Sequence, residues 1–192
     1  MTARLIKFVA LTTLAVWSAS CGEFTREGQS PVFVVVDKLT AVGVENNTIL
    51  SDVLTNGGTF NDLAEVEMSL MLKDPGVPGI ASVPSALNSV TINRYHVAYR
   101  RTDGRATQGV DVPYAFDSAL TFTIPSGQTG SAVFQIVRHS AKEEAPLKAL
   151  AFNGNIISTI AEVTFYGRDQ AGNDIAASAQ VGIDFGDFAD PN

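Results

Sequence analysis

Cysteine, tryptophan and histidine are nearly absent from this 192-residue chain, which contains one, one and two of them respectively. One cysteine cannot form an internal disulfide, so a hydrophobic core has to hold the fold together. Neither histidine, His96 or His139, lies in a nucleophile motif such as G-x-S-x-G, and each is typical of a strand surface. Phosphate loops, dinucleotide fingerprints, zinc-ligand spacings and EF-hand loops are also missing. The sequence therefore predicts a protein that is not an enzyme and has no cofactor and no dedicated metal site.

The first twenty-one residues have the order of a secretory signal. Arg4 and Lys7 give the N-terminus a positive charge, and an apolar run over residues 8–17 follows them. Three small residues (18–20) come next, directly before the single cysteine, Cys21. The order charged, apolar and small is typical of a signal peptide, so we expect cleavage before Cys21.

A permanent membrane-spanning helix is the weaker interpretation of the same segment. The uncharged stretch Phe8–Gly22 has fifteen residues, whereas a helix that crosses a bilayer needs roughly twenty. We therefore predict that residues 1–20 form a signal peptide that the mature protein lacks.

A cysteine directly after such a segment resembles the lipobox of bacterial lipoproteins. In that family the thiol is diacylated and becomes the new N-terminus, and leucine usually stands three residues earlier, where this chain has Ser18. The resemblance implies a palmitate-type lipid on Cys21 that holds the mature protein in a membrane outside the cytoplasm. Family practice also associates Gly22, in place of Asp, with the outer membrane or the cell surface. The alternative is an ordinary secreted protein with a free N-terminal thiol.

The remaining chain divides into a tether and one domain. Residues 21–30 are short and polar, as expected of a flexible tether, and residues 31–192 form the predicted domain. Without residues 1–20 the chain keeps 11 Lys and Arg against 20 Asp and Glu, a net charge of −9. This balance excludes a basic nucleic-acid surface, and it leaves membrane attachment to the acyl chains alone.

The domain has the pattern of an all-β protein. Runs rich in Val, Ile, Phe, Tyr and Thr alternate with segments rich in Gly, Pro, Asn and Asp. In the last run, Val181, Ile183 and Phe185 alternate with polar neighbours, which predicts a strand with one buried face. Seven strands are predicted, over Val32–Val44, Glu65–Lys73, Ser89–Arg101, Ala119–Ile124, Ser131–His139, Ile156–Gly167 and Asp174–Phe185.

The turn between the last two strands resembles the closing hairpin of bacterial immunoglobulin-like domains. Those domains typically end with a strand, a turn of the form Asp-x-Ala-Gly-Asn and an alternating strand, and Asp169, Ala171, Gly172 and Asn173 occupy these positions here. The resemblance implies an immunoglobulin-like antiparallel β-sandwich of about seven strands with long loops.

Five departures from this simple pattern are expected. A β-bulge near residues 93–94 would let both apolar sets of the third strand face inward. Short helical pieces are expected over Asn61–Ala64 and Ala141–Leu150. Two long connections, residues 45–62 and 74–88, are predicted to be loops, the second because its three prolines oppose regular structure.

Three groups of residues are candidates for binding. Carboxylates gather at two places and could hold calcium, although hairpin chemistry also accounts for them: Asp169 and Asp174, and then Asp184, Asp187 and Asp190. The second group is the only concentration of arginines in the sequence: Arg94, Arg100, Arg101 and Arg105. These arginines either pair with acidic neighbours or bind an anionic partner such as a glycan. Sugar stacking would need clustered, exposed tyrosines, since Trp17 leaves with the signal: Tyr95, Tyr99, Tyr114 and Tyr166.

Together these observations predict a non-enzymatic lipoprotein of the cell envelope, which acts as a structural or interaction module for a protein or polysaccharide partner. The alternative is a surface-attached module that binds a carbohydrate or another small ligand, in one version with calcium. Nucleic acid is not an expected partner of either.

Overall fold

The structure, a computed structural model, describes residues 29–43 and 48–188. The predicted signal peptide, Cys21 and Asp190 lie outside these ranges. The described chain is all-β, with strands β1 (Val32–Ala41), β2 (Thr48–Asp52), β3 (Asp62–Leu72), β4 (Gly76–Val77), β5 (Ile80–Ala81), β6 (Val90–Arg101), β7 (Phe116–Ile124), β8 (Gly130–Val137), β9 (Ile157–Asp169) and β10 (Asp174–Gly186). Within the described ranges, helical structure is limited to three short pieces, η1 (Ala86–Asn88), α2 (His139–Lys142) and η2 (Leu147–Leu150).

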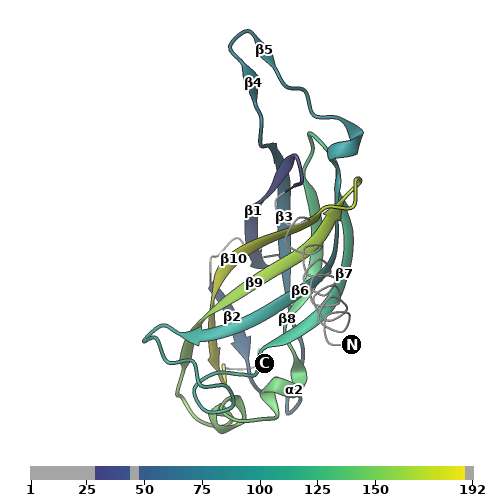
Figure 1. The fold of residues 1–192 in the computed structure, drawn as a ribbon. Coiled ribbons are helices and arrows are strands. Elements are labelled where there is room, and N and C mark those ends of the chain that lie inside the picture. The colour runs from purple at the N-terminus through teal and green to yellow at the C-terminus, as the bar shows by residue number, and fades with distance from the viewer. Residues whose placement is uncertain (1–28, 44–47, 189–192) are drawn as a thin grey trace, which may run out of the picture.

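The long strands form two sheets on either side of one core (Figure 1). One sheet has the order β1-β3-β8, and the other has the order β2-β10-β9-β6-β7 and curls into a half-barrel. The short strands β4 and β5 form a separate hairpin that projects from one end of the molecule. The seven predicted strands correspond to the seven that have eight or more residues, namely β1, β3, β6, β7, β8, β9 and β10. The all-β prediction is therefore confirmed.

The alternation of β10 is confirmed by its burial. Val181, Ile183 and Phe185 are buried, whereas Gln180, which directly precedes Val181, is exposed to solvent. On the neighbouring strand β9, Ala161, Val163 and Phe165 are fully buried, and in the antiparallel register Ala161 pairs with Val181. Period-two alternation on both strands therefore produces one continuous apolar face of the five-stranded sheet.

The bulge in β6 is also confirmed. The register with β9 shifts between Ile92 and Arg94, where β6 contains one extra residue. Ile92 before the shift and Tyr95 after it are both buried, although they differ in parity. The extra residue thus turns both apolar sets of β6 toward the core.

Two tyrosines of β6 connect the sheets through hydrogen bonds. The Tyr95 hydroxyl donates to the Gln135 carbonyl at 2.8 Å, and the Tyr99 hydroxyl donates to the Ile136 carbonyl at 2.6 Å, both on β8 of the opposite sheet. The Tyr95 ring also packs edge-on against Phe134 of β8, with 4.9 Å between centroids. Burial raises the pKa of both tyrosines. The two rings therefore fill the core while their polar ends are satisfied.

Three expectations about the connections are wrong. Asn61–Ala64 is not helical, because β3 begins at Asp62 and buries Ala64 against the core. Residues 45–62 contain β2, which runs parallel to β10, so the sheets are not entirely antiparallel. Residues 74–88 contain the β4–β5 hairpin and η1 in spite of their prolines. The prediction of helix over Ala141–Leu150 is confirmed in part, by α2 and η2.

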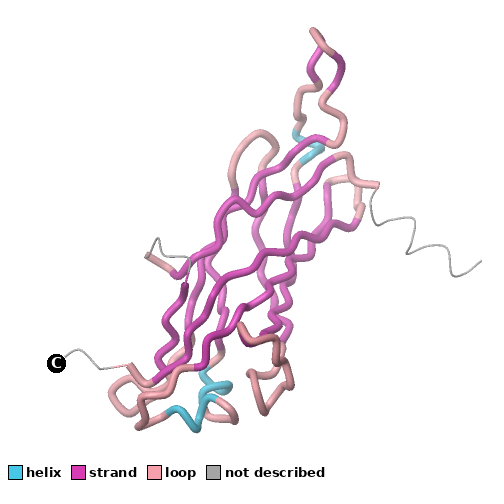
Figure 2. Tube along the Cα trace, turned by 90° about the vertical axis from the view of Figure 1, so that its left-hand side faces the viewer, coloured by secondary structure: helices cyan, strands magenta, loops and turns pink. Residues whose placement is uncertain are grey.

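The connections divide between two ends of the elongated β-structure, which Figure 2 shows in side view. The hairpin end carries the β4–β5 hairpin and the first described residues, and its connections are residues 29–31, 73–89, 125–129 and 170–173. The helical end carries α2 and η2, and its connections are residues 42–43, 53–61, 102–115, 138–156 and 187–188. The hairpin end is therefore the end at which the chain enters the fold.

The burial pattern of β10 gives a direct test of the core. Val181→Glu should bury an unpaired carboxylate and cost several kcal/mol of unfolding free energy, enough to unfold a marginally stable domain. Gln180→Glu adds the same charge on the outer face, near Arg100, and should change stability by about half a kcal/mol or less. Urea unfolding of both variants measures the difference, and equal destabilisation would refute the one-sided burial of β10.

Candidate functional site

A groove lies at the hairpin end of the fold, among the described residues. Its volume is about 810 Å³, within the range of roughly 300–1,000 Å³ that is usual for ligand pockets. It lies where the start of β1 approaches the β9–β10 hairpin and the bulge of β6. Segments far apart in the sequence therefore line it, namely residues 30, 32–34, 73, 93–94, 166–168 and 174–176.

The groove opens between two strands that are not paired with each other. Among the described strands, β1 pairs only with β3, and β10 pairs with β2 only over Gly182–Gly186. The first half of β10 therefore leaves one edge without a strand partner, and the same holds for the outer edge of β1. Such edges present rows of backbone donors and acceptors to whatever lies beside them.

Two cations of the groove lie on aromatic rings. The Arg94 guanidinium lies 4.1 Å from the centroid of the Tyr166 ring, and the Lys73 ammonium lies 5.0 Å from that of Phe33. Arg168, the third cation, pairs with Asp174 at 2.6 Å. The lining thus contains three cations and one carboxylate, in a chain whose overall charge is negative. Anionic groups are the ligands that this charge pattern favours.

The hairpin turn beside the groove is held by Asp169. Its carboxylate accepts hydrogen bonds from the backbone N–H groups of Ala171 and Asn173, both at 2.9 Å, and from the Asn173 amide at 2.8 Å. Burial raises the pKa of Asp169, but these bonds and one from Ser30 outweigh it and hold the pKa below its usual value. Gly172 has a φ of 85°, as the expected turn requires. Asp169 is therefore a structural residue of the turn.

The structure distributes the other candidate carboxylates over separate contacts. Asp174 pairs with Arg168, and Asp187 accepts a hydrogen bond from the Phe152 backbone N–H. Asp184 lies on β10 at the opposite end from the turn. Among the described residues, no three Asp, Glu, His or Cys side chains gather in a way that could hold a metal ion.

The arginine group does not form one patch. Arg94 lies in the groove and pairs with Asp117 at 3.0 Å. Arg101 and Arg105 both contact Asp103 at the helical end, at 3.4 Å and 2.8 Å. Arg100 donates a long hydrogen bond of 3.4 Å to Gln180. Pairing with acidic neighbours thus accounts for most of this group, and Arg94 alone joins the groove.

The tyrosines do not form an exposed platform. Tyr95 and Tyr99 are 2% and 6% exposed, respectively, and belong to the core. Tyr114 is half exposed but lies at the helical end, and Tyr166 has Arg94 on its ring. The clustered aromatic surface that sugar stacking would need is not present among these four residues.

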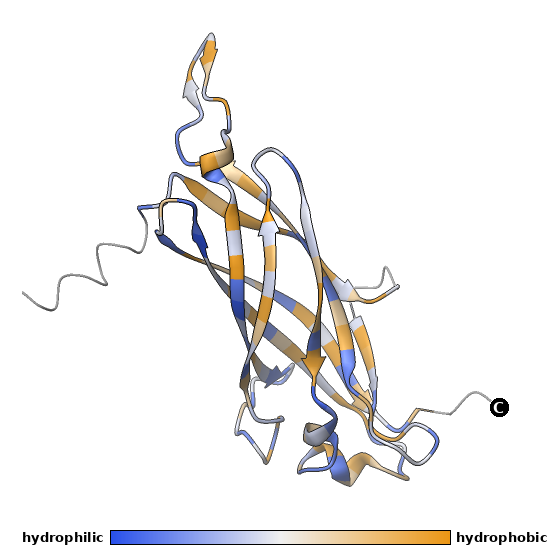
Figure 3. Cartoon of the chain, turned by 90° about the vertical axis from the view of Figure 1, so that its right-hand side faces the viewer, coloured by the Kyte–Doolittle hydropathy of each residue, from blue (hydrophilic) through white to orange (hydrophobic). Residues whose placement is uncertain are grey.

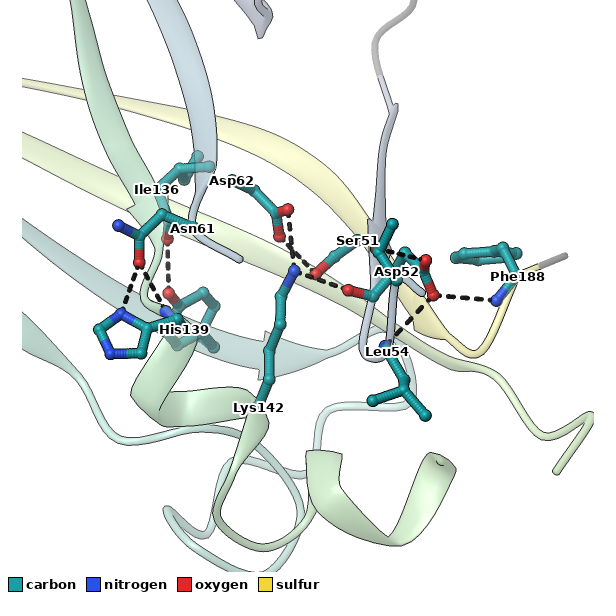
Figure 4. Close-up of polar contacts among 11 residues, drawn as sticks. Ser51, Asp52, Leu54, Asn61, Asp62, Ile136, His139, Lys142 and Phe188 are labelled. Carbon is teal, nitrogen blue, oxygen red and sulfur yellow. Dashed lines mark hydrogen bonds and ion pairs between the residues drawn. The ribbon is translucent and has the colours of Figure 1, made fainter. Parts of the chain in front are cut away.

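A second polar cluster lies at the helical end, around Lys142 (Figure 4). The Lys142 side chain is 1% exposed, and its ammonium donates to the Asp52 carbonyl at 2.7 Å and to the Asp62 carboxylate at 2.9 Å. The Ser51 hydroxyl donates to the same carboxylate at 2.5 Å. Burial raises the pKa of Asp62, while Lys142 and Ser51 act against that rise. The cluster ties α2 to β2 and β3.

The two histidines have structural contacts only. His96 faces outward from β6, with its ring nitrogen 3.2 Å from Asp117. His139 begins α2, and its backbone and ring nitrogens lie 2.7 and 3.0 Å from the Asn61 side-chain oxygen (Figure 4). Neither histidine has a hydroxyl or thiol nucleophile among these contacts.

Sequence reasoning missed Phe33, Lys73 and Lys142. Phe33 and Lys73 lie at opposite ends of two predicted strands, and only the antiparallel register of β1 with β3 brings them together. Lys142 follows a strand in a polar segment, where lysine is ordinarily solvated. No local pattern distinguishes these three residues from surface residues.

Comparisons with known proteins add little about function. No family model and no curated protein matches the chain. Among solved structures, the structural-genomics target SoR45 shares 10% identity with a TM-score of 0.37 and covers 80% of this chain and 86% of its own. A late embryogenesis abundant (LEA) protein shares 10% identity with a TM-score of 0.40, over 95% of this chain and 88% of its own.

A third solved structure, the sporulation control protein Spo0M from Bacillus subtilis, shares 11% identity with a TM-score of 0.27, over 79% of this chain and 48% of its own. These scores are too low for any of the three to inform on what this chain does. No helix within the described ranges is long and apolar enough to cross a bilayer.

The Lys142 cluster predicts a distinctive mutational pattern. Lys142→Met should cost about 3 kcal/mol or more at neutral pH, because it leaves Asp62 charged and partly buried without its partner. The double variant Lys142→Met/Asp62→Leu should regain most of this loss. Urea unfolding measures both, and a double variant no more stable than the single one would contradict the ion-pair explanation.

The same single variant should respond to pH in a defined direction. Without Lys142, burial should raise the pKa of Asp62 further above its ordinary value of 3.8. The folded state then binds a proton more readily than the unfolded state, so the unfolding free energy should rise as the pH falls through the raised pKa toward 3.8. The unfolding free energy is measured relative to that of Lys142→Met/Asp62→Leu at each pH. A relative free energy that falls steadily as the pH is lowered would contradict the raised pKa of Asp62.

Proposed function

We propose that this protein is a non-enzymatic lipoprotein of the cell envelope, which is held in a membrane through a lipid on Cys21 and presents its β-sandwich as an interaction module outside the cytoplasm. The order of charged, apolar and small residues directly before the only cysteine carries this proposal. A short tether would suffice, since Ser30, which is buried at the start of the described residues, comes nine positions after Cys21.

We further propose that the sandwich is of the immunoglobulin-like type. The order β1-β3-β8 corresponds to strands A, B and E of that fold, and β6-β9-β10 corresponds to C, F and G. In the constant-type domain the fourth strand joins the first sheet, whereas β7 pairs with β6 in the second sheet. Variable-type domains also extend the second sheet beyond strand C, and this placement of β7 resembles them.

The groove at the hairpin end is the proposed contact for a partner. Its two unpaired strand edges suit an extended polypeptide, which could add backbone hydrogen bonds along β1 or β10. Its cations, Lys73, Arg94 and Arg168, favour acidic side chains on that polypeptide. An acidic, extended segment of an envelope protein is therefore the partner that the groove fits best.

A carbohydrate-binding module is the competing function, and the groove is less suited to a sugar than to a polypeptide. Sugars stack on open aromatic faces, but a cation already lies over each of the two rings of the groove, Arg94 over Tyr166 and Lys73 over Phe33. The cations would still attract an acidic polysaccharide. Binding of a neutral glycan would argue against the proposed protein partner.

The proposed lipid anchor predicts that Cys21 is acylated. The full chain produced in a bacterial host with labelled palmitate should incorporate the label and fractionate with membranes. Cys21→Ala should lose the label and either leave the membrane or keep its signal uncleaved. Ser20→Ala, which keeps a small residue before the cysteine, serves as the control and should behave as the wild type. Wild-type protein that is cleaved, soluble and unlabelled would refute the lipid anchor.

Binding in the groove is the next prediction. A synthetic extended peptide of alternating Glu and Val should bind the full acylated chain in detergent, with an affinity that falls as salt rises. Arg94→Glu should weaken binding about tenfold, equivalent to about 1.4 kcal/mol. Arg100→Glu makes the same charge change on the same strand outside the groove and should have little effect. Calorimetric titration compares them, and equal effects would rule out a local site.

A further inference from the structure

An uncharged, apolar finger projects from the hairpin end. It comprises residues 75–89, among which there is no charged residue, and includes β4, β5 and η1 (Figure 1). Apolar residues occupy its tip and flanks, as the hydropathy colours in Figure 3 show. Four large ones are mostly exposed: Val77 (62%), Ile80 (74%), Val83 (83%) and Leu87 (73%). Exposed apolar clusters of this kind mark surfaces that contact a partner or a membrane.

The finger has a defined shape. Val77 pairs with Ile80 across a tip formed by Pro78 and Gly79, and Gly79 has a φ of 89°. Proline followed by glycine with positive φ is the preferred sequence of a type II turn. At the root, the Asp74 carboxylate accepts a hydrogen bond from the Gly76 N–H at 2.9 Å. The apolar side chains are thus held outward by a hairpin and do not belong to a collapsed loop.

The chain enters the fold at the root of this finger. The Lys73 N–H, directly before the finger, donates to the Pro31 carbonyl at 2.9 Å, and Val32 pairs with Leu72. Ser30 is buried beside the same end. Eight residue-to-residue steps separate Cys21 from position 29, and a fully extended chain of that length spans at most about 29 Å. A lipid on Cys21 therefore restricts the hairpin end to the neighbourhood of the membrane.

The charges of the two ends fit that orientation. In the described connections of the hairpin end, Lys73 and Asp74 are the only charged residues. The described connections of the helical end contain nine Asp, Glu, Lys and Arg residues: Asp103, Arg105, Asp111, Arg138, Lys142, Glu143, Glu144, Lys148 and Asp187. Burying charge in a bilayer is costly, and the strand ends at the hairpin end carry Arg168, Asp169 and Asp174. The uncharged finger is therefore the part of this end that is suited to contact lipid.

We propose that the apolar finger inserts into the interfacial layer of the bilayer that holds the Cys21 lipid, and so orients the domain with its helical end outward. This inference rests on the proposed anchoring at Cys21. The finger alone has too few apolar residues for firm attachment, but the tether turns its insertion into an intramolecular step at high effective concentration. The finger thus supplies orientation, whereas the acyl chains supply affinity.

A single tryptophan can report this insertion, because the mature chain contains none once Trp17 is removed. Ile80→Trp places it at the tip of the finger. Phe152→Trp is the matched control, an aromatic replacement at an 87%-exposed position of the helical end. Both full-chain variants are produced in a bacterial host, purified from membranes and reconstituted in vesicles of phosphatidylethanolamine and phosphatidylglycerol, with or without bromine on the acyl chains.

The expected result is a blue-shifted Ile80→Trp emission that loses most of its intensity when the lipids are brominated, with no shift and no quenching for Phe152→Trp. Mass spectrometry of the N-terminal peptide, from the same samples, shows whether Cys21 is acylated. An acylated protein with an unquenched, unshifted tip would overturn the finger insertion and leave the lipoprotein proposal standing. A blue-shifted but unquenched tip would mean that protein, such as a second copy, covers the finger. An unacylated Cys21 would overturn both proposals.

Discussion

One extra residue in β6 determines which side chains of that strand face the core and which face outward. The bulge between Ile92 and Arg94 changes the parity of the strand, so that Tyr95 and Tyr99 point inward and donate hydrogen bonds to β8. The same change turns Arg94 outward, onto Tyr166. The tyrosine hydrogen bonds between the sheets and the position of Arg94 in the groove therefore both depend on the same bulge.

The groove exists because the sandwich is not closed along one side. β2 covers only the last five residues of β10, and β1 stays with β3 in the other sheet. Open strand edges invite unwanted pairing, which proteins commonly limit with charges and bulges. β1 contains such a bulge between Val36 and Lys38. The bulge interrupts the edge of β1, and the groove lies beside the part that precedes it, at residues 32–34.

The two ends of the molecule have different polar chemistry. At the helical end, a buried lysine is stabilised by a carboxylate and a carbonyl, which fixes α2 against β2 and β3. At the hairpin end, Asp169 fixes the turn through backbone amides, and the finger beyond it has no charge. An anchored protein that meets lipid at one end and solvent at the other would require this asymmetry.

The sequence by itself determined the seven long strands, the β6 bulge and the Asp169 turn, because each depends on side-chain parity or on turn chemistry within a few neighbouring residues. It also determined the expectation of a lipid on Cys21, which stays a prediction. Only the tertiary structure decided that β2 pairs in parallel with β10, that Phe33 meets Lys73, and that Lys142 is buried. These contacts join segments that are distant in the chain, and local periodicity carries no information about which distant edges and side chains will meet.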